Sequence, residues 1–199
     1  MQIMYNCDDS RIIYLFRHGE TNWNVEDRVM GQLEGIETKF TNKGYKQIKE
    51  ISKKIEEKNV EVIYCSDFQR AYETALIANE KLRVPIFPEK KLRGLNMGKY
   101  QGLLFEDFIN RKEVIECFRN YDLKIGGGES INELNARIFN FIKNIVKNNN
   151  YQRIAIITHS AVISNLRAYL SKSNYLSLME CSLLYKNNEL LVTEYVCNK

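Results

Sequence analysis

The chain has 199 residues, 44% of them hydrophobic, and a formal net charge of +4 at pH 7. This length suits one domain with a sizeable core, and no linker or repeat divides it, so we predict a single domain over residues 1–199. The modest charge, no signal peptide and no run of roughly 20 apolar residues predict a soluble, cytoplasmic protein that binds neither nucleic acid nor a membrane.

Strand and helix patterns alternate along the first half of the chain. Apolar runs predict strands, and isoleucines at helical spacing predict an amphipathic helix. The expected elements are a strand over residues 11–17, a polar, glycine-containing loop over 19–40, a helix over about 45–55, a short strand over 60–64, a helix over about 68–82 and an edge strand over 85–88.

The second half begins with an irregular segment and then returns to the same alternation. Its expected elements are short helices within residues 105–121, a glycine break at 126–128, a helix from a capping box at 130–133 to about 147, a strand over 153–158, a helix over 162–170 and a hairpin of strands over 181–185 and 190–196. The alternation predicts an α/β fold, a three-layer α/β/α sandwich with a mostly parallel central sheet.

The chain contains only two histidines, and each lies at the end of a predicted strand, just before an expected helix. His18 follows the strand over 11–17, and His159 follows the strand over 153–158. The carboxyl ends of parallel strands open into a common crevice where ligands bind. The leading hypothesis is therefore an active site that contains both histidines.

Two arginines are predicted to reach the same crevice. Arg17 directly precedes His18, and Arg70 lies near the start of the helix that follows the second strand. A guanidinium is a planar fork of donors that matches phosphate oxygens and stays charged at any working pH. The positive surroundings also favour a neutral His18, the nucleophilic form. Together these residues indicate a phosphate site.

Four segments in order carry a family resemblance: Arg17-His18-Gly19-Glu20-Thr21 with Asn24, Ser66-Asp67-Phe68-Gln69-Arg70-Ala71, Gly128-Glu129-Ser130 and Thr158-His159-Ser160. With them the chain resembles the histidine phosphatase superfamily, which includes phosphoglycerate mutases, over residues 11 to about 170. The resemblance implies a phosphoglycerate mutase-like fold and a phosphohistidine intermediate.

The resemblance also implies a role for each matching residue. His18 would be the nucleophile, and the phosphoryl oxygens would be held by Arg17, Asn24, Arg70, His159 and Ser160. Neither a metal nor a cofactor is expected, because the fixed positive charges would stabilise the phosphoryl oxygens as Mg²⁺ does in other phosphoryl-transfer enzymes. The five widely spaced cysteines, without a Cys-x-x-Cys pair, also argue against a zinc site.

One position departs from the family pattern. The family segment resembling Leu-Arg-Glu supplies a glutamate thought to protonate the leaving oxygen, and here Gly94 stands in its place. Three explanations remain open. In the first, another carboxylate replaces the glutamate, and the nearest in sequence are Glu106, Asp107 and Glu129. In the second, the substrate has a good leaving group, such as a phenol or an acyl phosphate. In the third, the chain is a weak or inactive relative that retains a phosphate pocket.

The sequence thus predicts a metal-independent phosphatase that hydrolyses a small phosphorylated metabolite. The alternatives are a phosphoglycerate mutase-type phosphotransferase and a phosphate-binding relative with little or no activity. The short chain favours the phosphatase, because a short lid leaves the phosphoenzyme open to water. Four aromatic residues of the irregular segment, expected mainly in the core, are available to contact a substrate: Tyr100, Phe105, Phe108 and Phe118.

Overall fold

A central sheet organises the protein in a computed structural model that describes residues 10–33, 38–171 and 193–198. Five strands of this part form the order β3-β2-β4-β1-β5. Their bounds are β1 Ser10–Arg17, β2 Val62–Cys65, β3 Ile86–Pro88, β4 Arg153–Thr158 and β5 Thr193–Asn198. The first four strands run parallel, and β5 pairs antiparallel with β1. The predicted, mostly parallel sheet is confirmed, with β3 at its edge.

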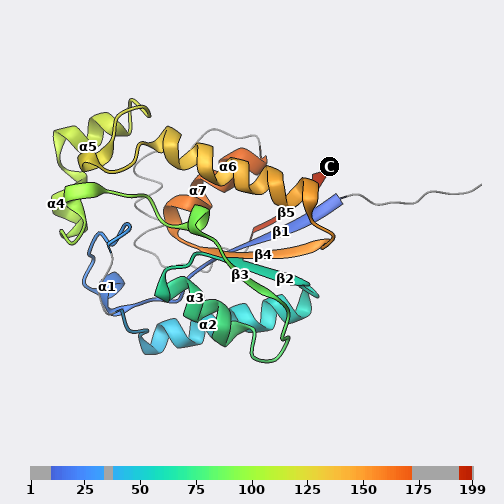
Figure 1. The fold of residues 1–199 in the computed structure, drawn as a ribbon. Coiled ribbons are helices and arrows are strands. Elements are labelled where there is room, and N and C mark those ends of the chain that lie inside the picture. Colours follow the sequence, from blue (N-terminus) through green and yellow to red (C-terminus); the bar gives the residue numbers. More distant parts are fainter. Residues whose placement is uncertain (1–9, 34–37, 172–192, 199) are drawn as a thin grey trace, which may run out of the picture.

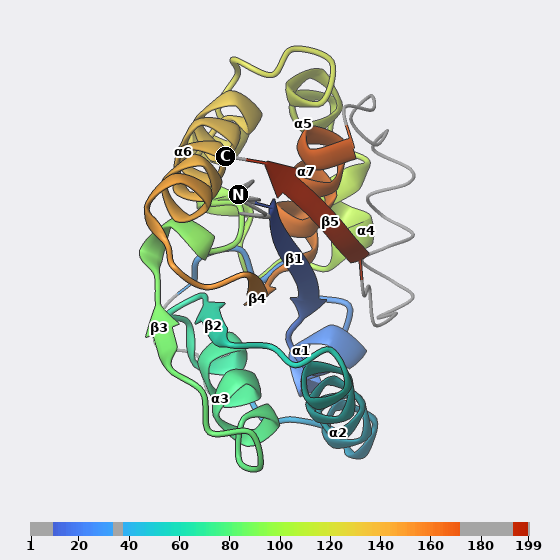
Figure 2. The ribbon, with the colours of Figure 1, turned by 90° about the vertical axis from the view of Figure 1, so that its right-hand side faces the viewer.

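Helices cover both faces of this sheet (Figures 1 and 2). Helices α2 (Asn42–Glu57) and α3 (Gln69–Ala78) lie on one face, and α6 (Ile131–Asn148) and α7 (Ser160–Ser171) lie on the other. Strand side chains alternate between the two cores. In β1, Ile13 and Leu15 pack with the α6 and α7 side, whereas Tyr14 and Phe16 pack with the α2 and α3 side. The three-layer sandwich is therefore confirmed.

Shorter elements lie beyond the carboxyl ends of β1 and β4 (Figure 1). They are α1 (Asn22–Val25), α4 (Phe105–Ile109), α5 (Lys112–Cys117) and the 3-10 helices η1 (Lys90–Leu92), η2 (Gly98–Tyr100) and η3 (Ile125–Gly127). The irregular segment with short helices is confirmed, whereas α1 lies in the stretch predicted to be a loop. Within the described residues, no helix is both long and apolar enough to cross a membrane.

The end of α3 differs from its predicted position. Helix α3 ends at Ala78 instead of about residue 82, because the Asn79 side chain accepts a hydrogen bond from the Val84 N–H (3.0 Å) and donates one to the Val84 carbonyl (2.8 Å). Arg83 closes this turn with a φ of 56°. At the C-terminus, the predicted strand over 181–185 lies outside the described residues, and the end of the second predicted strand belongs to β5.

The capping box predicted for α6 is present and gives a test of the fold. The Ser130 hydroxyl accepts a hydrogen bond from the Glu133 N–H (3.1 Å), and the Glu133 carboxylate accepts one from the Ser130 N–H (2.9 Å). We predict that Ser130→Ala lowers the free energy of unfolding by about 1 kcal/mol, measured by urea denaturation. Lys143→Ala, at an exposed position of the same helix, is the control and should change it by less than about 0.5 kcal/mol.

Candidate active site

The register of β1 and β4 brings the two histidines together. Arg17 pairs with Thr158 at the carboxyl ends of these parallel strands, so His18 and His159 each follow a paired residue. The backbone N–H of His18 donates a hydrogen bond to the Thr158 carbonyl at 3.0 Å. The centroids of the two imidazole rings lie 5.3 Å apart, with an angle of 61° between the ring planes. The predicted meeting of the histidines is therefore present in the structure.

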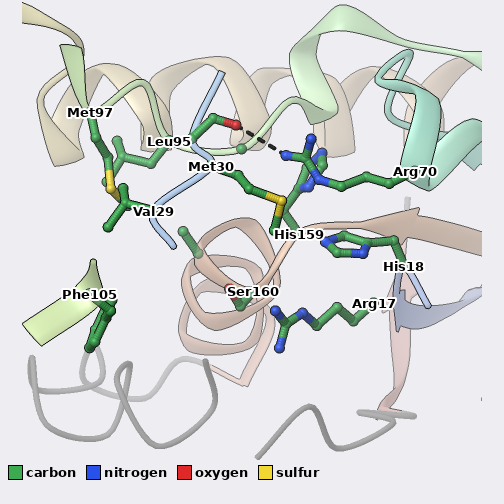
Figure 3. A pocket seen from close by; sticks show the side chains of 13 residues that line it. Arg17, His18, Val29, Met30, Arg70, Leu95, Met97, Phe105, His159 and Ser160 are labelled. Atoms are coloured by element: carbon green, nitrogen blue, oxygen red, sulfur yellow. Dashed lines mark hydrogen bonds between the residues drawn. The ribbon is translucent and has the colours of Figure 1, made fainter. Parts of the chain in front are cut away.

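A cavity of about 50 Å³ lies against both histidines and both predicted arginines (Figure 3). Arg17 comes from the last residue of β1, and Arg70 from the first turn of α3. Arg17 and Arg70 are only 3% and 5% exposed. The Arg70 Nη2 donates a hydrogen bond to the Gly31 carbonyl at 3.1 Å, which directs its guanidinium across the cavity.

The cavity has two chemically different parts, as Figure 3 shows. Arg17, His18 and Arg70 lie together at one side, with His159 and Ser160 next to them. The apolar lining residues are Val29, Met30, Leu95, Met97, Phe105 and Ala161. Of the aromatic residues considered from the sequence, Phe105 lines the cavity, and Tyr100 and Phe108 lie in the core. The site thus combines a cationic part with an apolar wall.

A backbone contact determines which nitrogen of His18 carries a proton. His18 Nδ1 lies 2.8 Å from the Gly19 carbonyl oxygen. Because a carbonyl oxygen only accepts hydrogen bonds, Nδ1 carries the proton, and Nε2 of the neutral ring keeps a lone pair. The Gly19 N–H donates to the Thr74 hydroxyl (3.1 Å), which donates to the Arg70 carbonyl (2.7 Å). This chain of hydrogen bonds holds His18 against α3.

Sequence reasoning missed Thr74, although a signal for it exists. Thr74 is fully buried and lies four residues after Arg70 on α3, and residues at this spacing share one face of a helix. It therefore ties the loop that carries Gly19 to the helix that carries Arg70. The hydroxyl of Ser66 holds the second histidine in a similar way, because it lies within hydrogen-bond distance of His159 Nε2 (2.9 Å).

Burial and nearby charge keep both imidazoles neutral. Desolvation lowers the pKa of His18 well below its ordinary value, and the guanidiniums of Arg70 and Arg17 lower it further. The pKa of His159 is also lowered well below its ordinary value by desolvation, then by Arg70. A neutral imidazole is a nucleophile, whereas imidazolium is not. The cations that would attract a phosphate therefore also keep His18 in its reactive form.

Asn24 and Ser160 were predicted to contact the phosphate. Ser160, the first residue of α7, lines the cavity, whereas Asn24 is not one of its lining residues. The Asn24 Oδ1 accepts hydrogen bonds from the N–H and hydroxyl of Thr21, both at 3.0 Å. Its Nδ2 is buried and has no hydrogen-bond partner among the described residues. The phosphate contact of Asn24 stays a prediction.

Gly94 lies directly at the cavity. A Cβ at this position would lie 3.4 Å from Cγ of His159 and 3.3 Å from the Gly31 carbonyl oxygen. The Gly94 carbonyl accepts hydrogen bonds from Gln32 Nε2 (2.8 Å) and Arg137 Nη2 (2.9 Å). A side chain at residue 94 would therefore start beside His159. The hydrogen bonds from Gln32 and Arg137 would hold the backbone of residue 94 in place.

None of the three carboxylates considered as replacement acids lines the cavity in the described structure. Glu106 and Asp107 are exposed residues of α4. Glu129 accepts hydrogen bonds from Arg137 Nε (2.6 Å) and Nη2 (3.0 Å). The described lining residues include no aspartate or glutamate, so a proton donor of this type is not part of the described wall.

Comparison with known proteins identifies the class. Residues 13–195 match the family described as histidine phosphatase superfamily (branch 1), and the chain belongs to this family. Phosphoglycerate mutase-like protein 4 of Arabidopsis thaliana is 31% identical, with coverage of 77% of this chain and 68% of the relative. The metal-independent phosphoserine phosphatase of Arabidopsis thaliana is 32% identical, with coverage of 76% and 65%.

A solved structure supports the same fold. A mutant phosphoserine phosphatase from Entamoeba histolytica, in complex with phosphoserine, superposes with a TM-score of 0.68 at 21% identity, covering 93% of this chain and 96% of that one. Relatives are thus named both phosphatases and mutases.

The two histidines allow a direct test of the electrostatics, because every imidazole signal of the protein comes from one of them. We predict that NMR of the free protein shows both rings neutral at pH 6.5, where an ordinary imidazole is half protonated. Arg70→Met should move both pKa values upward, because it removes a positive charge that opposes protonation. Two ordinary titrations centred near pH 6.5 in the folded wild type would contradict this electrostatic account.

Proposed function

We propose that this protein is a metal-independent phosphatase that hydrolyses a small phosphomonoester through a phosphohistidine at His18. The observation that carries the proposal is one cavity lined by Arg17, Arg70, His159 and His18, whose Nδ1 is turned to the Gly19 carbonyl so that Nε2 keeps its lone pair. These groups provide a nucleophile and fixed positive charge for one phosphoryl group. A loose transition state for phosphoryl transfer spreads charge over three equatorial oxygens, which such donors stabilise.

The proposed reaction has two steps. In the first, the lone pair of His18 Nε2 forms a bond to phosphorus while the bond from phosphorus to the ester oxygen breaks, and the leaving oxygen takes a proton or departs as an anion. In the second, water attacks phosphorus, the N–P bond breaks, and inorganic phosphate leaves with His18 neutral again. Arg17, Arg70 and the Nδ1 of His159, which has no hydrogen-bond partner among the described residues, are the donors proposed for the phosphoryl oxygens.

The wall beyond the cationic part supports a phosphatase over a phosphoglycerate mutase. A mutase must hold the carboxylate of glycerate while the phosphoryl group returns to it. Arg17 and Arg70 are the arginines of the described lining, and both lie in the part assigned to phosphate. The remaining wall is apolar, and an unpaired carboxylate buried against it would lose its hydration without a partner.

The nucleophile gives the first functional test. We predict that His18→Asn lowers kcat for para-nitrophenyl phosphate by at least about 10⁴-fold, because no phosphoenzyme can form. Wild-type turnover should persist in EDTA. Rapid quenching of the wild type with labelled substrate should trap a phosphoryl group that is labile in acid and stable in alkali, and His18→Asn should trap none. Turnover retained by His18→Asn would overturn the proposed intermediate.

Residue 94 gives a second test with a matched control. We predict that Gly94→Glu raises kcat/KM for an alkyl phosphate with an uncharged alkyl group, such as benzyl phosphate, by about 100-fold, because a positioned carboxylic acid is worth roughly 10²- to 10⁴-fold. Gly94→Gln adds nearly the same volume without an acid and should give no gain. The Cβ contacts of 3.3 and 3.4 Å require only small shifts of the neighbours. Equal rates for the glutamate and glutamine variants would contradict a missing acid.

A further inference from the structure

We propose that the natural substrates are aryl phosphates with an uncharged leaving group. This inference rests on the proposed phosphatase and adds the chemistry of its substrate. Two observations carry it: the apolar wall opposite the cationic residues, and the glycine at the point where a proton-donating side chain would begin. The first concerns which group binds, and the second concerns which bond breaks.

The apolar wall is built from several separate segments. Val29 and Met30 follow α1, Leu95 and Met97 lie between η1 and η2, Phe105 begins α4, and Ala161 lies in the first turn of α7. Leu95 is 2% exposed and Phe105 is 6% exposed, so both are held firmly by the core. Met97 is half-buried, and its flexible thioether adapts to the surface of a ring.

This wall fits an apolar group and disfavours a charged one. A ring packed on it loses apolar surface to water, which is favourable. An ammonium or carboxylate in the same place would be desolvated, and the described lining offers it no countercharge outside the phosphate part.

The chemistry of the leaving oxygen selects among apolar esters. An alkoxide is a strong base and needs a proton as the bond to phosphorus breaks. A phenol has a pKa of about 10, as in tyrosine, so its anion departs with little help. No carboxylate lines the described cavity, and a side chain at residue 94 would have started 3.4 Å from Cγ of His159. The site is therefore suited to the bond between phosphorus and a phenolic oxygen.

Three esters separate these two requirements. Relative to 4-methylphenyl phosphate, benzyl phosphate keeps the apolar ring but leaves as an alkoxide, and phosphotyrosine keeps the phenol but adds a charged ammonium and carboxylate. We expect kcat/KM for 4-methylphenyl phosphate to exceed that for benzyl phosphate by at least about 100-fold. It should exceed that for phosphotyrosine by about tenfold.

The apolar wall itself is tested with two variants of residue 97 that have similar length but different charge. Met97→Lys places a cation in the wall and should reduce the preference for 4-methylphenyl phosphate over phosphotyrosine to below about threefold. Met97→Gln, neutral and of similar length, should have an intermediate effect. Leu123→Lys is the control, because Leu123 is 39% exposed and is not one of the lining residues. It should keep the wild-type preference.

Each result has a distinct meaning. Hydrolysis of benzyl phosphate at a similar rate, lost in His18→Asn, would overturn the aryl requirement and leave the phosphatase standing. Equal rates for phosphotyrosine would overturn the uncharged leaving group. If no ester is hydrolysed, the proposed function fails. The binding of phosphonates then tests whether the wall favours an apolar group. Phenylphosphonate should bind about tenfold more tightly than methylphosphonate, and equal dissociation constants would overturn the apolar wall.

Discussion

The parallel pairing of β1 with β4 is the constraint on which the site depends. Because Arg17 is opposite Thr158, both histidines emerge at the same edge of the sheet. Side chains alternate along a strand, so a slip of one residue would exchange the two faces of β1 and move Arg17 relative to His159. The apolar residues of β1 prevent such a slip, since Ile13 and Leu15 belong to one core and Tyr14 and Phe16 to the other. Core packing thereby determines the geometry of the candidate site.

Buried positive charge is the second consequence of this pairing. Two nearly inaccessible guanidiniums next to two imidazoles make protonation of either ring unfavourable, which the lowered pKa values of His18 and His159 express. Burying a cation costs free energy that an opposite charge offsets. A phosphate dianion is such a charge, and its arrival would raise the pKa of both rings. Under the proposed function, anion affinity and a neutral nucleophile would thus have one electrostatic cause.

The sequence predicted the parts of the protein that depend on local pattern. Apolar runs located β1 and β4, the capping box located the start of α6, and ordered motifs located both histidines and both arginines. Features set by tertiary contacts were not accessible in this way. Thr74 matters because Gly19 lies against α3, and α3 ends early because Asn79 binds the backbone of Val84. The split of the cavity into a cationic part and an apolar wall likewise comes from segments far apart in the chain.

One short segment connects Gly94 with the apolar wall. Residue 94 lacks a side chain, and Leu95 and Met97, which follow it, line the cavity. In an apolar setting a carboxyl group keeps its proton more readily, so a wall of this kind would have favoured a glutamic acid as donor. Under the proposed function, with Gly94 the same wall would surround the leaving oxygen and supply no proton. Under the proposed function, selectivity then follows from the acidity and polarity of the leaving group, and the enzyme would choose a class of ester instead of recognising the polar groups of one metabolite.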